Sequence, residues 1–596
     1  MRPAFFRAAV ALAPVLALAL AACSQGGESP AAGGGGEGGG TSSTAAALSA
    51  AAGAYSEPGS LPEPEPVLTA QADQAQAPGP AAAGEQAPDG SVYGDSLLDA
   101  AIAEATNLIP ALASDTSSTA ITGQVYRGLI KFDKDLELTG DLAESWEISD
   151  DQLTVTFKLK DGVKWEDGAP VTSEDCLFTW RLMSDPKTPT PYGEDFRQVA
   201  EASAPDPLTF KVTYRRVLAS AVSVWGFSIM PRHLLEGVDL DESPLARKPV
   251  GNGPFKLKSW ETGQRVTLAA SESYSGGRPR LDSLVTSIIP DMATQMMELR
   301  TGRLDMMGLL PDQWEQASRD PELNSRFAFY RYPAFSYTYL GFNFNDRRLA
   351  DVKVRQAINF AIDKDEIVEG VLLGLGTVAN GPFKPDMWAN NKGVLPYPYD
   401  PDRARALLKE AGWSDTDGDG YLEKEGRRFT LTVLTNQGNK VREQCGLIIQ
   451  QRLKDVGIEV KIRVLEWAAL TKENLDKHDF ESVIMGWTIP RDPDLFDVFN
   501  STKTNPGELN FISYSNSEVD ELIDKARFTL EHGARKAALD RIQEIFYEDV
   551  PYVFLFVPDS LIALSNRFQG PEVAPIGLGY NIEEWWVPKD RQLWTH

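Results

Sequence analysis

The alternation of apolar and polar residues after about residue 130 predicts β-structure. Residues 153–159 alternate with a period of two and then reach a turn at Asp161-Gly162. This period is typical of a strand with one buried face, so we expect a strand and a hairpin here. Residues 259–271 predict a second antiparallel pair, which turns at Thr262-Gly263.

Further along the chain, helical periods alternate with strands. One helix is expected to begin at Asp400-Pro401, an N-cap followed by a first-turn proline, and to end at Gly412. The next helix is expected to end at Gly457 and to lead into an alternating strand over 458–464. A helix followed directly by a strand indicates an α/β unit.

The last third of the chain predicts two more helices before a buried strand. Ser517 and Asp520 resemble a capping box at the start of the first helix. The second carries apolar residues over 538–545, and the apolar run 553–557 after it is typical of a buried strand.

The N-terminal residues predict export to the outside of the cytoplasm. Residues 1–22 resemble a secretory signal peptide, with two arginines, an apolar stretch and small residues at the end. Cys23 follows a lipobox-like run, so we expect it to be acylated and to anchor the chain to a membrane, with ordinary cleavage as the alternative. The Gly, Ala and Pro-rich residues 23–91 are expected to form a disordered linker.

Composition and motifs argue against several classes of protein. The formal net charge of −27, without a basic stripe, argues against a nucleic-acid partner. The four histidines have no metal-ligand spacing, and we find no nucleophile elbow or Walker loop. We therefore expect neither an enzyme nor a bound cofactor or metal. Cys176 and Cys445 lie among apolar residues and are expected in the core.

One acidic segment resembles a calcium loop. Asp415, Asp417 and Asp419 stand at alternate positions, and Gly420 follows at the place of the sharp turn. The twelfth position is Gly426, where a calcium loop has a bidentate glutamate. The sequence alone therefore favours a turn rich in Asp and Gly, with a calcium site as the alternative.

Several segments in a fixed order resemble a known family. They include GDLAESWEISDDQLTVTFKLKDGVKWEDGAPVTSEDCLFTW, GNGPFKLKSW, LGFNFNDRRLADVKVRQAINFAIDKDEIVEGV and YDPDRARALLKEAGW, and they are spread over about 95–560. The family is that of the extracellular solute-binding proteins that serve ABC importers as oligopeptide, dipeptide and nickel receptors. The resemblance implies a two-lobed α/β fold of the large peptide-receptor type, with an extra β-rich subdomain, which closes by hinge bending.

The resemblance also implies an order of domains along the chain. The first lobe would comprise residues 92–290, with the β-rich subdomain at about 134–245. The second α/β lobe would comprise residues 291–550, and residues 551–596 would return to the first lobe. We expect the chain to cross between the lobes near 287–291 and near 550–553.

Candidate ligand-binding residues follow from the same resemblance. Trp487 matches a tryptophan that faces the cleft, although it could instead fill the core. Pro490 stands where dipeptide and oligopeptide receptors have an aspartate for the ligand's α-ammonium, which leaves Asp492 as the best substitute. Arg491 could receive a carboxylate, unless it and Asp492 form a solvated pair. Tyr337 and Tyr339 alternate along a predicted strand near the hinge, where one of them could face the cleft, with a place in the core or at the surface as the alternative for each.

The function implied is that of a monomeric, lipid-anchored receptor in the periplasm or at the cell surface. It would capture peptides between its lobes and deliver them to an ABC permease with its ATPase subunits. Another solute, such as an oligosaccharide or a metal chelate, is the alternative within this class. A peptide-holding adaptor that docks on no importer is the alternative from another class.

Overall fold

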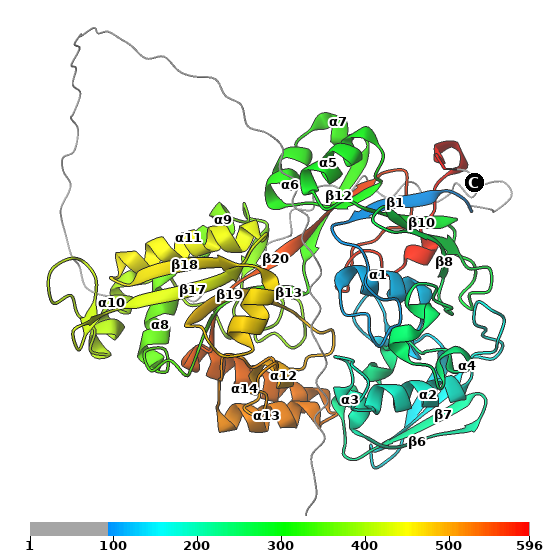
Figure 1. Cartoon of the computed structure of the whole chain (residues 1–596), viewed down its shortest axis with the longest axis horizontal. Coiled ribbons are helices and arrows are strands. Elements are labelled where there is room, and N and C mark those ends of the chain that lie inside the picture. Colours follow the sequence, from blue (N-terminus) through cyan, green and yellow to red (C-terminus); the bar gives the residue numbers. More distant parts are fainter. Residues whose placement is uncertain (1–92, 595–596) are drawn as a thin grey trace, which may run out of the picture. The chain divides into compact units, whose positions relative to one another are not determined.

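Two four-stranded sheets form the first part of the protein in the computed structural model, which describes residues 93–594 (Figure 1). The first sheet has the order β1 (Ser96–Ala101), β10 (Ser283–Ile288), β9 (Arg265–Ala270) and β8 (Phe255–Glu261). The second has the order β4 (Ala143–Ile148), β5 (Thr154–Leu159), β7 (Thr209–Tyr214) and β6 (Val199–Asp206). A short antiparallel pair is formed by β2 (Ile130–Phe132) and β3 (Leu138–Gly140).

One hydrophobic core unites this part, which we call the first lobe. Its helices are α1 (Thr116–Val125), α2 (Ser173–Ser184), α3 (Glu194–Arg197) and α4 (Arg232–Leu235). Leu268 of the first sheet and Phe157 of the second belong to the same buried cluster. Trp225 packs edge-on against Phe210, with ring centroids 4.6 Å apart, so aromatic packing contributes to this core.

The strand predicted over 153–159 is β5, but its predicted hairpin is wrong. After the turn at Asp161-Gly162 the chain forms a short loop, and β5 pairs instead with β4 and β7. Pairing with β7 joins segments far apart in the sequence, which a local pattern cannot show. The second predicted pair is confirmed as β8 and β9, where Gly263 adopts a φ of 69° at the turn.

An eight-stranded sheet forms the centre of the second lobe. Its main path has the order β11 (Met306–Gly308), β20 (Tyr552–Ser565), β13 (Ser336–Phe342), β19 (Ser482–Thr488), β17 (Thr430–Asn436) and β18 (Glu459–Leu465). Two more strands pair with β20, namely β12 (Phe327–Pro333) and β14 (Gly376–Val378). A small hairpin, β15 (Glu423–Lys424) with β16 (Arg427–Arg428), lies outside this sheet.

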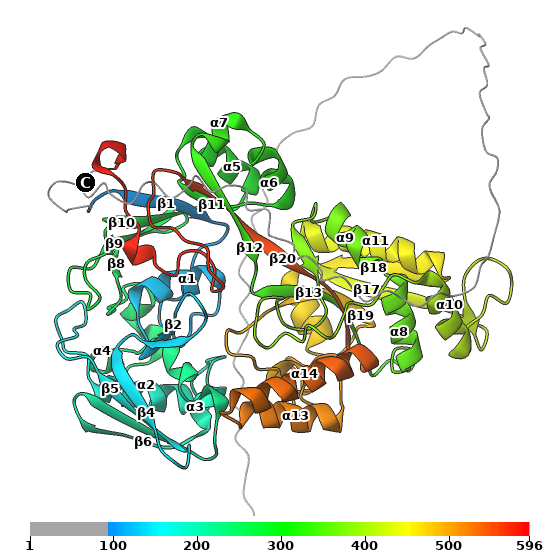
Figure 2. The same ribbon diagram turned by 180° about the vertical axis from the view of Figure 1, so that it is seen from behind.

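Helices pack on both faces of this sheet because its side chains alternate between two buried clusters. Leu340 belongs to a cluster with residues of α8 (Val352–Ala361), α9 (Lys364–Gly370), α10 (Pro401–Glu410) and α11 (Lys440–Asp455). Tyr339, the preceding residue, belongs to a cluster with residues of α12 (Phe496–Phe499), α13 (Ser517–Arg527) and α14 (His532–Asp549). In both views α11 and the α13–α14 pair lie on opposite sides of β17 and β19 (Figures 1 and 2). The result is a three-layer α/β lobe.

The predicted helices and strands of the second lobe are confirmed, with one correction at a helix start. The elements α10, α11, β18, α13, α14 and β20 match their predicted segments. The predicted capping box of α13 is wrong, because Asn516 is the N-cap and accepts the backbone N–H groups of Glu518 and Val519. Asp520 instead accepts hydrogen bonds from the backbone and hydroxyl of Ser501.

A single long strand, β20, runs from one buried cluster to the next. Its first half pairs with β13 and β14, and its second half pairs with β11 and β12. Val557 is buried with the second lobe, whereas Leu561 is buried with the helices α5 (Met292–Thr301), α6 (Pro311–Ala317) and α7 (Pro321–Asn324). Leu564 then joins the core of the first lobe. The predicted lobe boundaries remain a prediction.

A buried ion pair fixes the end of β20 to the start of the described chain. Arg567 donates to both oxygens of Asp305, at 2.9 and 2.6 Å, and also to Asp95. Cys176 and Cys445 are buried and not joined in a disulfide, which confirms their expected place in the core. No helix within residues 93–594 has the length and apolar character needed to cross a membrane. The predicted signal peptide, Cys23 and the linker lie outside the described residues.

Candidate functional site

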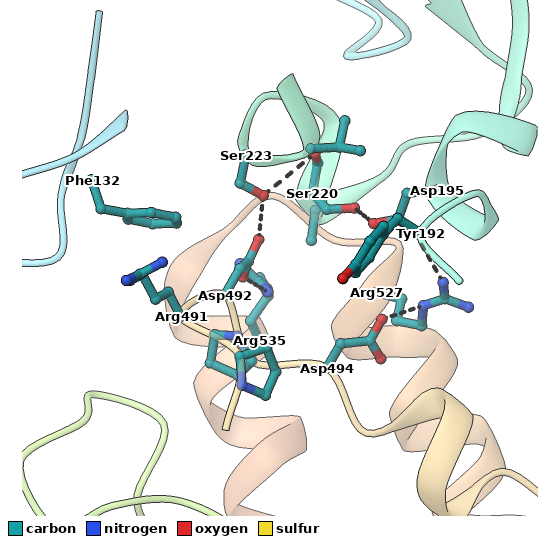
Figure 3. A pocket seen from close by; sticks show the side chains of 14 residues that line it. Phe132, Tyr192, Asp195, Ser220, Ser223, Arg491, Asp492, Asp494, Arg527 and Arg535 are labelled. Carbon is teal, nitrogen blue, oxygen red and sulfur yellow. Dashed lines mark hydrogen bonds and ion pairs between the residues drawn. The ribbon is translucent and has the colours of Figure 1, made fainter. Parts of the chain in front are cut away.

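A pocket of about 480 Å³ has walls from both lobes (Figure 3). The first lobe contributes Phe132 of β2, Tyr192 and Asp195 near α3, and the turn that carries Ser220 and Ser223. The second lobe contributes Arg527 at the end of α13, Arg535 of α14, and the loop 490–494 that follows β19. The volume is within the range of about 300–1,000 Å³ that is typical of small-molecule sites.

Two prolines shape the loop that β19 presents to this pocket. Pro490 follows the last residues of β19, and proline cannot donate the backbone hydrogen bond that would extend the sheet. Pro493 restricts the backbone just before Asp494, whose side chain accepts the N–H of Phe496, the first residue of α12, at 2.9 Å. The loop therefore holds Arg491 and Asp492 in a restricted backbone between two elements of the second lobe.

Asp492 is engaged on both of its oxygens. Arg535 donates to one oxygen at 2.7 Å, and the Ser223 hydroxyl donates to the other at 2.7 Å. The first bond is within the second lobe, whereas the second joins the two lobes. Asp492 therefore acts in this structure as a contact between lobes, and both of its oxygens already accept a hydrogen bond.

Arg527 forms a second contact between the lobes. Its guanidinium lies 3.2 Å from Asp195 of the first lobe and 3.0 Å from Asp494 of its own lobe, and only 6% of its side chain is exposed. The Ser220 hydroxyl also donates to Asp195, at 2.6 Å. Desolvation raises the pKa of Asp494 to about 6, although Arg527 acts in the opposite direction. A guanidinium shared by two carboxylates makes this contact dependent on charge.

Arg491 differs from the other charged residues of the pocket. Among residues 93–594 no carboxylate forms an ion pair with it, and its guanidinium carbon lies 6.0 Å from the centre of the Phe335 ring. The residue is exposed, yet desolvation near the pocket walls lowers the pKa of its guanidinium below the usual value. Figure 3 shows it extending toward Phe132 and away from the ion pairs. It is a donor available to a bound anion.

The three predicted aromatic residues are not among the residues that line the pocket. Tyr337 and Tyr339 are buried in the core of the second lobe. Trp487 is half-buried, pairs with Tyr337 across β19 and β13, and donates its indole N–H to the Tyr552 hydroxyl at 3.2 Å. Of the predicted site residues, the structure thus brings Arg491 and Asp492 into the pocket and leaves the aromatic three outside its lining. Their role in ligand binding remains a prediction.

Sequence reasoning missed seven polar residues of the pocket. These are Tyr192, Asp195, Ser220, Ser223, Asp494, Arg527 and Arg535. Only Arg527 carried a usable signal, because it continues the buried stripe of Val519 and Ile523 at a spacing of four residues. A charged residue on such a stripe predicts a buried ion pair. The others come from distant parts of the sequence, and the two groups face one pocket only when the lobes meet.

The chemistry of the pocket is that of binding. Its described lining contains carboxylates, guanidinium groups and hydroxyls, but no histidine or cysteine. Each carboxylate of the lining is held in a hydrogen bond or ion pair, so none is presented as a free general base. A two-lobed α/β binding protein, with a pocket lined by both lobes, is the class that the fold and the site define.

Comparison with known proteins identifies the family within this class. The profile described as "Bacterial extracellular solute-binding proteins, family 5 Middle" matches residues 137–508. The chain is 35% identical over 505 residues to the oligopeptide-binding protein AppA of Bacillus subtilis, covering 83% of this chain and 92% of AppA. It is 30% identical over 496 residues to the probable D,D-dipeptide-binding periplasmic protein DdpA of Escherichia coli, covering 80% and 91%.

Solved structures agree with this assignment. AppA from Bacillus subtilis in complex with a nonapeptide has a TM-score of 0.74 and 33% identity, covering 84% of this chain and all of that one. NikZ from Campylobacter jejuni in complex with Ni(L-His) has a TM-score of 0.74 and 28% identity, covering 83% and 99%. The chain belongs to the family 5 bacterial extracellular solute-binding proteins. It is a transport receptor that works outside the cytoplasm and not an enzyme, and the resemblance seen in the sequence is confirmed.

Proposed function

We propose that this protein is the peptide receptor of an ABC importer, which captures its ligand in the pocket between the lobes. The observation that carries the proposal is that both lobes line one pocket and meet through Asp492 with Ser223 and Arg527 with Asp195. A ligand that bridges the same walls stabilises the closed arrangement, as expected for hinge closure. Likeness to AppA, whose structure contains a nonapeptide, supports peptides as the ligand class.

The ligand is recognised through a carboxylate and not through its α-ammonium group. Asp492 already accepts hydrogen bonds from Arg535 and Ser223, and Asp494 pairs with Arg527. Proline occupies position 490, so both acids of this loop are engaged within the protein. Arg491, in contrast, is exposed in the pocket lining and has a guanidinium without an ion pair among the described residues. A carboxylate of the ligand could therefore form a charge-assisted hydrogen bond with it. We assign the ligand's terminal carboxylate, or an acidic side chain, to Arg491.

Titration calorimetry with modified peptides tests this assignment. Peptides that co-purify with the full chain would be sequenced and synthesised as the free acid, the C-terminal amide and the N-acetyl form. We expect Arg491→Gln to weaken binding of a peptide that contacts it about tenfold, or about 1.4 kcal/mol. If Arg491 contacts the terminal carboxylate, amidation of the peptide's C-terminus should weaken binding to the original protein by a similar factor. Acetylation of the N-terminus should change the affinity less than threefold.

A matched control is the exposed Arg463 of β18, far along the sheet from the loop 490–494. Arg463→Gln removes the same charge and should leave peptide affinity unchanged. Equal affinity of the Arg491→Gln variant and the original protein for every tested peptide would reject the carboxylate assignment. The receptor role is tested separately, by whether any peptide binds to the protein.

A metal chelate is the second candidate ligand. NikZ, a structural relative at 28% identity, was solved with Ni(L-His). The pocket lining contains no histidine among the described residues, so a chelate would have to bring its own ligands and present carboxylates to Arg491. Elemental analysis of the purified protein for transition metals decides between the two, because a chelate leaves a stoichiometric transition metal and a peptide does not.

The lipid anchor and the importer partner are further parts of the proposal. Acylation of Cys23 would hold the receptor at the membrane, with residues 23–91 as a flexible tether. Labelling cells with an alkynyl fatty acid should mark the protein and should fail with Cys23→Ser. Cross-linking in membranes should recover permease and ATPase subunits. Recovery of ligand-bound protein without any importer subunit would favour the adaptor alternative.

A further inference from the structure

Four carboxylates of the second lobe meet in a loop that the proposed function does not use. Asp415, Asp417, Asp419 and Glu423 each place an oxygen within 4.8 Å of the others. The loop connects the turn after α10 with the small hairpin of β15 and β16. None of these residues lines the pocket between the lobes.

The backbone folds so that these carboxylates lie near one another, the three aspartates exposed and Glu423 buried. Asp415 accepts the N–H groups of Gly418 at 2.7 Å and Gly420 at 3.0 Å, and both glycines have a positive φ, of 82° and 91°. Asp417 and Asp419 each accept the N–H of the second residue after them. Such turns form without a metal and would not by themselves indicate one.

Glu423 provides the independent observation. The residue is only 9% exposed, and one of its oxygens accepts the backbone N–H of Thr416 at 2.8 Å and its hydroxyl at 2.9 Å. The other oxygen, Oε1, is buried and has no hydrogen-bond partner among the described residues. Burying a carboxylate oxygen without a hydrogen-bond partner costs free energy, and a cation beside it would offset that cost.

The positive charge available from the protein does not balance the cluster. Arg428 of β16 forms an ion pair with Asp419, but no other lysine or arginine of residues 93–594 pairs with Asp415, Asp417 or Glu423. Four carboxylate groups at this spacing repel one another unless a cation lies between them. A divalent cation would supply the missing charge.

We propose that Asp415, Asp417, Asp419 and Glu423 bind a calcium ion. Calcium takes six to eight oxygen ligands at flexible angles, which suits a set of carboxylates on a loop better than the strict octahedron of magnesium. Gly426 stands at the twelfth position, where a calcium loop has glutamate, and Glu423 takes over that role from β15. The affinity expected is that of extracellular modules, with a Kd of about 0.1–1 mM.

Calcium titration of the full chain tests the proposal. After EDTA treatment and dialysis, calorimetry with CaCl₂ should show one site, and MgCl₂ should bind at least tenfold more weakly. Asp417→Asn and Glu423→Gln should each weaken calcium binding at least tenfold. Both substitutions keep an oxygen that can accept the hydrogen bonds described for Asp417 and Glu423. Unchanged circular dichroism in EDTA would show that the variants fold.

Glu425→Gln is the matched control, because Glu425 is exposed in the same hairpin and outside the cluster. It should bind calcium like the original protein. Terbium gives a second signal, since Tyr421 within the loop can sensitise its luminescence and calcium should then displace it. No binding up to 5 mM CaCl₂ would overturn the proposal. Undiminished binding by folded Glu423→Gln or, should that variant not fold, by Asp417→Asn would overturn it as well.

Discussion

Asparagine in place of Asp195 should loosen the contact between the lobes without unfolding either one. Arg527 keeps its partner Asp494, 3.0 Å away, so no buried guanidinium is left unpaired. The change removes the charge from an interaction that spans 3.2 Å between the lobes. Charge-assisted hydrogen bonds contribute about 1.5–3 kcal/mol. Because 25% of the Asp195 side chain is exposed, we expect the lower end of this range, or about a tenfold shift toward the open form.

Single-molecule energy transfer between the lobes measures this shift. Dyes would be attached to cysteines at Lys211 on β7 and Lys472 in the second lobe, both of which are exposed. Cys176 and Cys445 are buried and should not be labelled, and Cys23 would be replaced by serine. The ratio of closed to open molecules without ligand should fall about tenfold in the Asp195→Asn protein.

A second pair of charges between the lobes supplies the control. Arg216 follows β7 and lies 3.9 Å from Asp524 of α13, with side chains 51% and 49% exposed. Exposed pairs contribute little, so Asp524→Asn should shift the ratio less than twofold. The reasoning is refuted if Asp195→Asn leaves the ratio within twofold of the original, or if Asp524→Asn shifts it equally.

Three further predictions concern the stability of the fold and the role of Trp487 in ligand binding. Arg567→Met leaves Asp95 and Asp305 buried without their cation and should cost about 3–5 kcal/mol in urea unfolding, and a loss below 1 kcal/mol would contradict the assigned ion pair. Burial lowers the pKa of Lys364 to about 7, so the unfolded chain binds more protons between pH 7 and 10. The free energy of unfolding therefore rises with pH above 7, by up to about 1.4 kcal/mol per pH unit. As pH falls to 7, the contribution that the neutral Lys364 makes to stability is lost. The stability advantage of Lys364→Met should therefore shrink from pH 7 to pH 9, and a constant difference would refute the low pKa. Trp487→Phe keeps an aromatic ring beside Tyr339, so peptide affinity measured by calorimetry should change less than threefold, whereas a larger loss would place the indole at the ligand.

The sequence predicted local elements well because their signals are local. Asp400 caps α10 through the N–H of Arg403, and proline follows it in the first turn, as the sequence pattern indicated. Strand β18 alternates and follows α11 directly, which makes the α/β unit visible without any knowledge of its neighbours. The neighbour of β5 was not visible, because β7 lies about fifty residues away and the choice depends on packing.

The pocket was predictable only in part for the same reason. The loop with Arg491 and Asp492 could be found from its place after a strand and from the family resemblance. The different contacts of these two residues could not be predicted, because Asp492 contacts Ser223, a residue 269 positions away, only in the folded protein. Glu423 shows the same limit, since its buried, unpaired oxygen is a property of packing and not of the sequence pattern.

Native mass spectrometry of the full chain, purified without denaturant, tests the receptor assignment most directly. The account predicts a population of protein carrying adducts that fragment into amino-acid sequences and that are lost on unfolding. Added synthetic copies of these peptides should restore the adducts and increase the closed fraction seen by energy transfer. A protein that carries only sugar or metal-chelate masses, or that binds none of the added peptides, would contradict the peptide receptor.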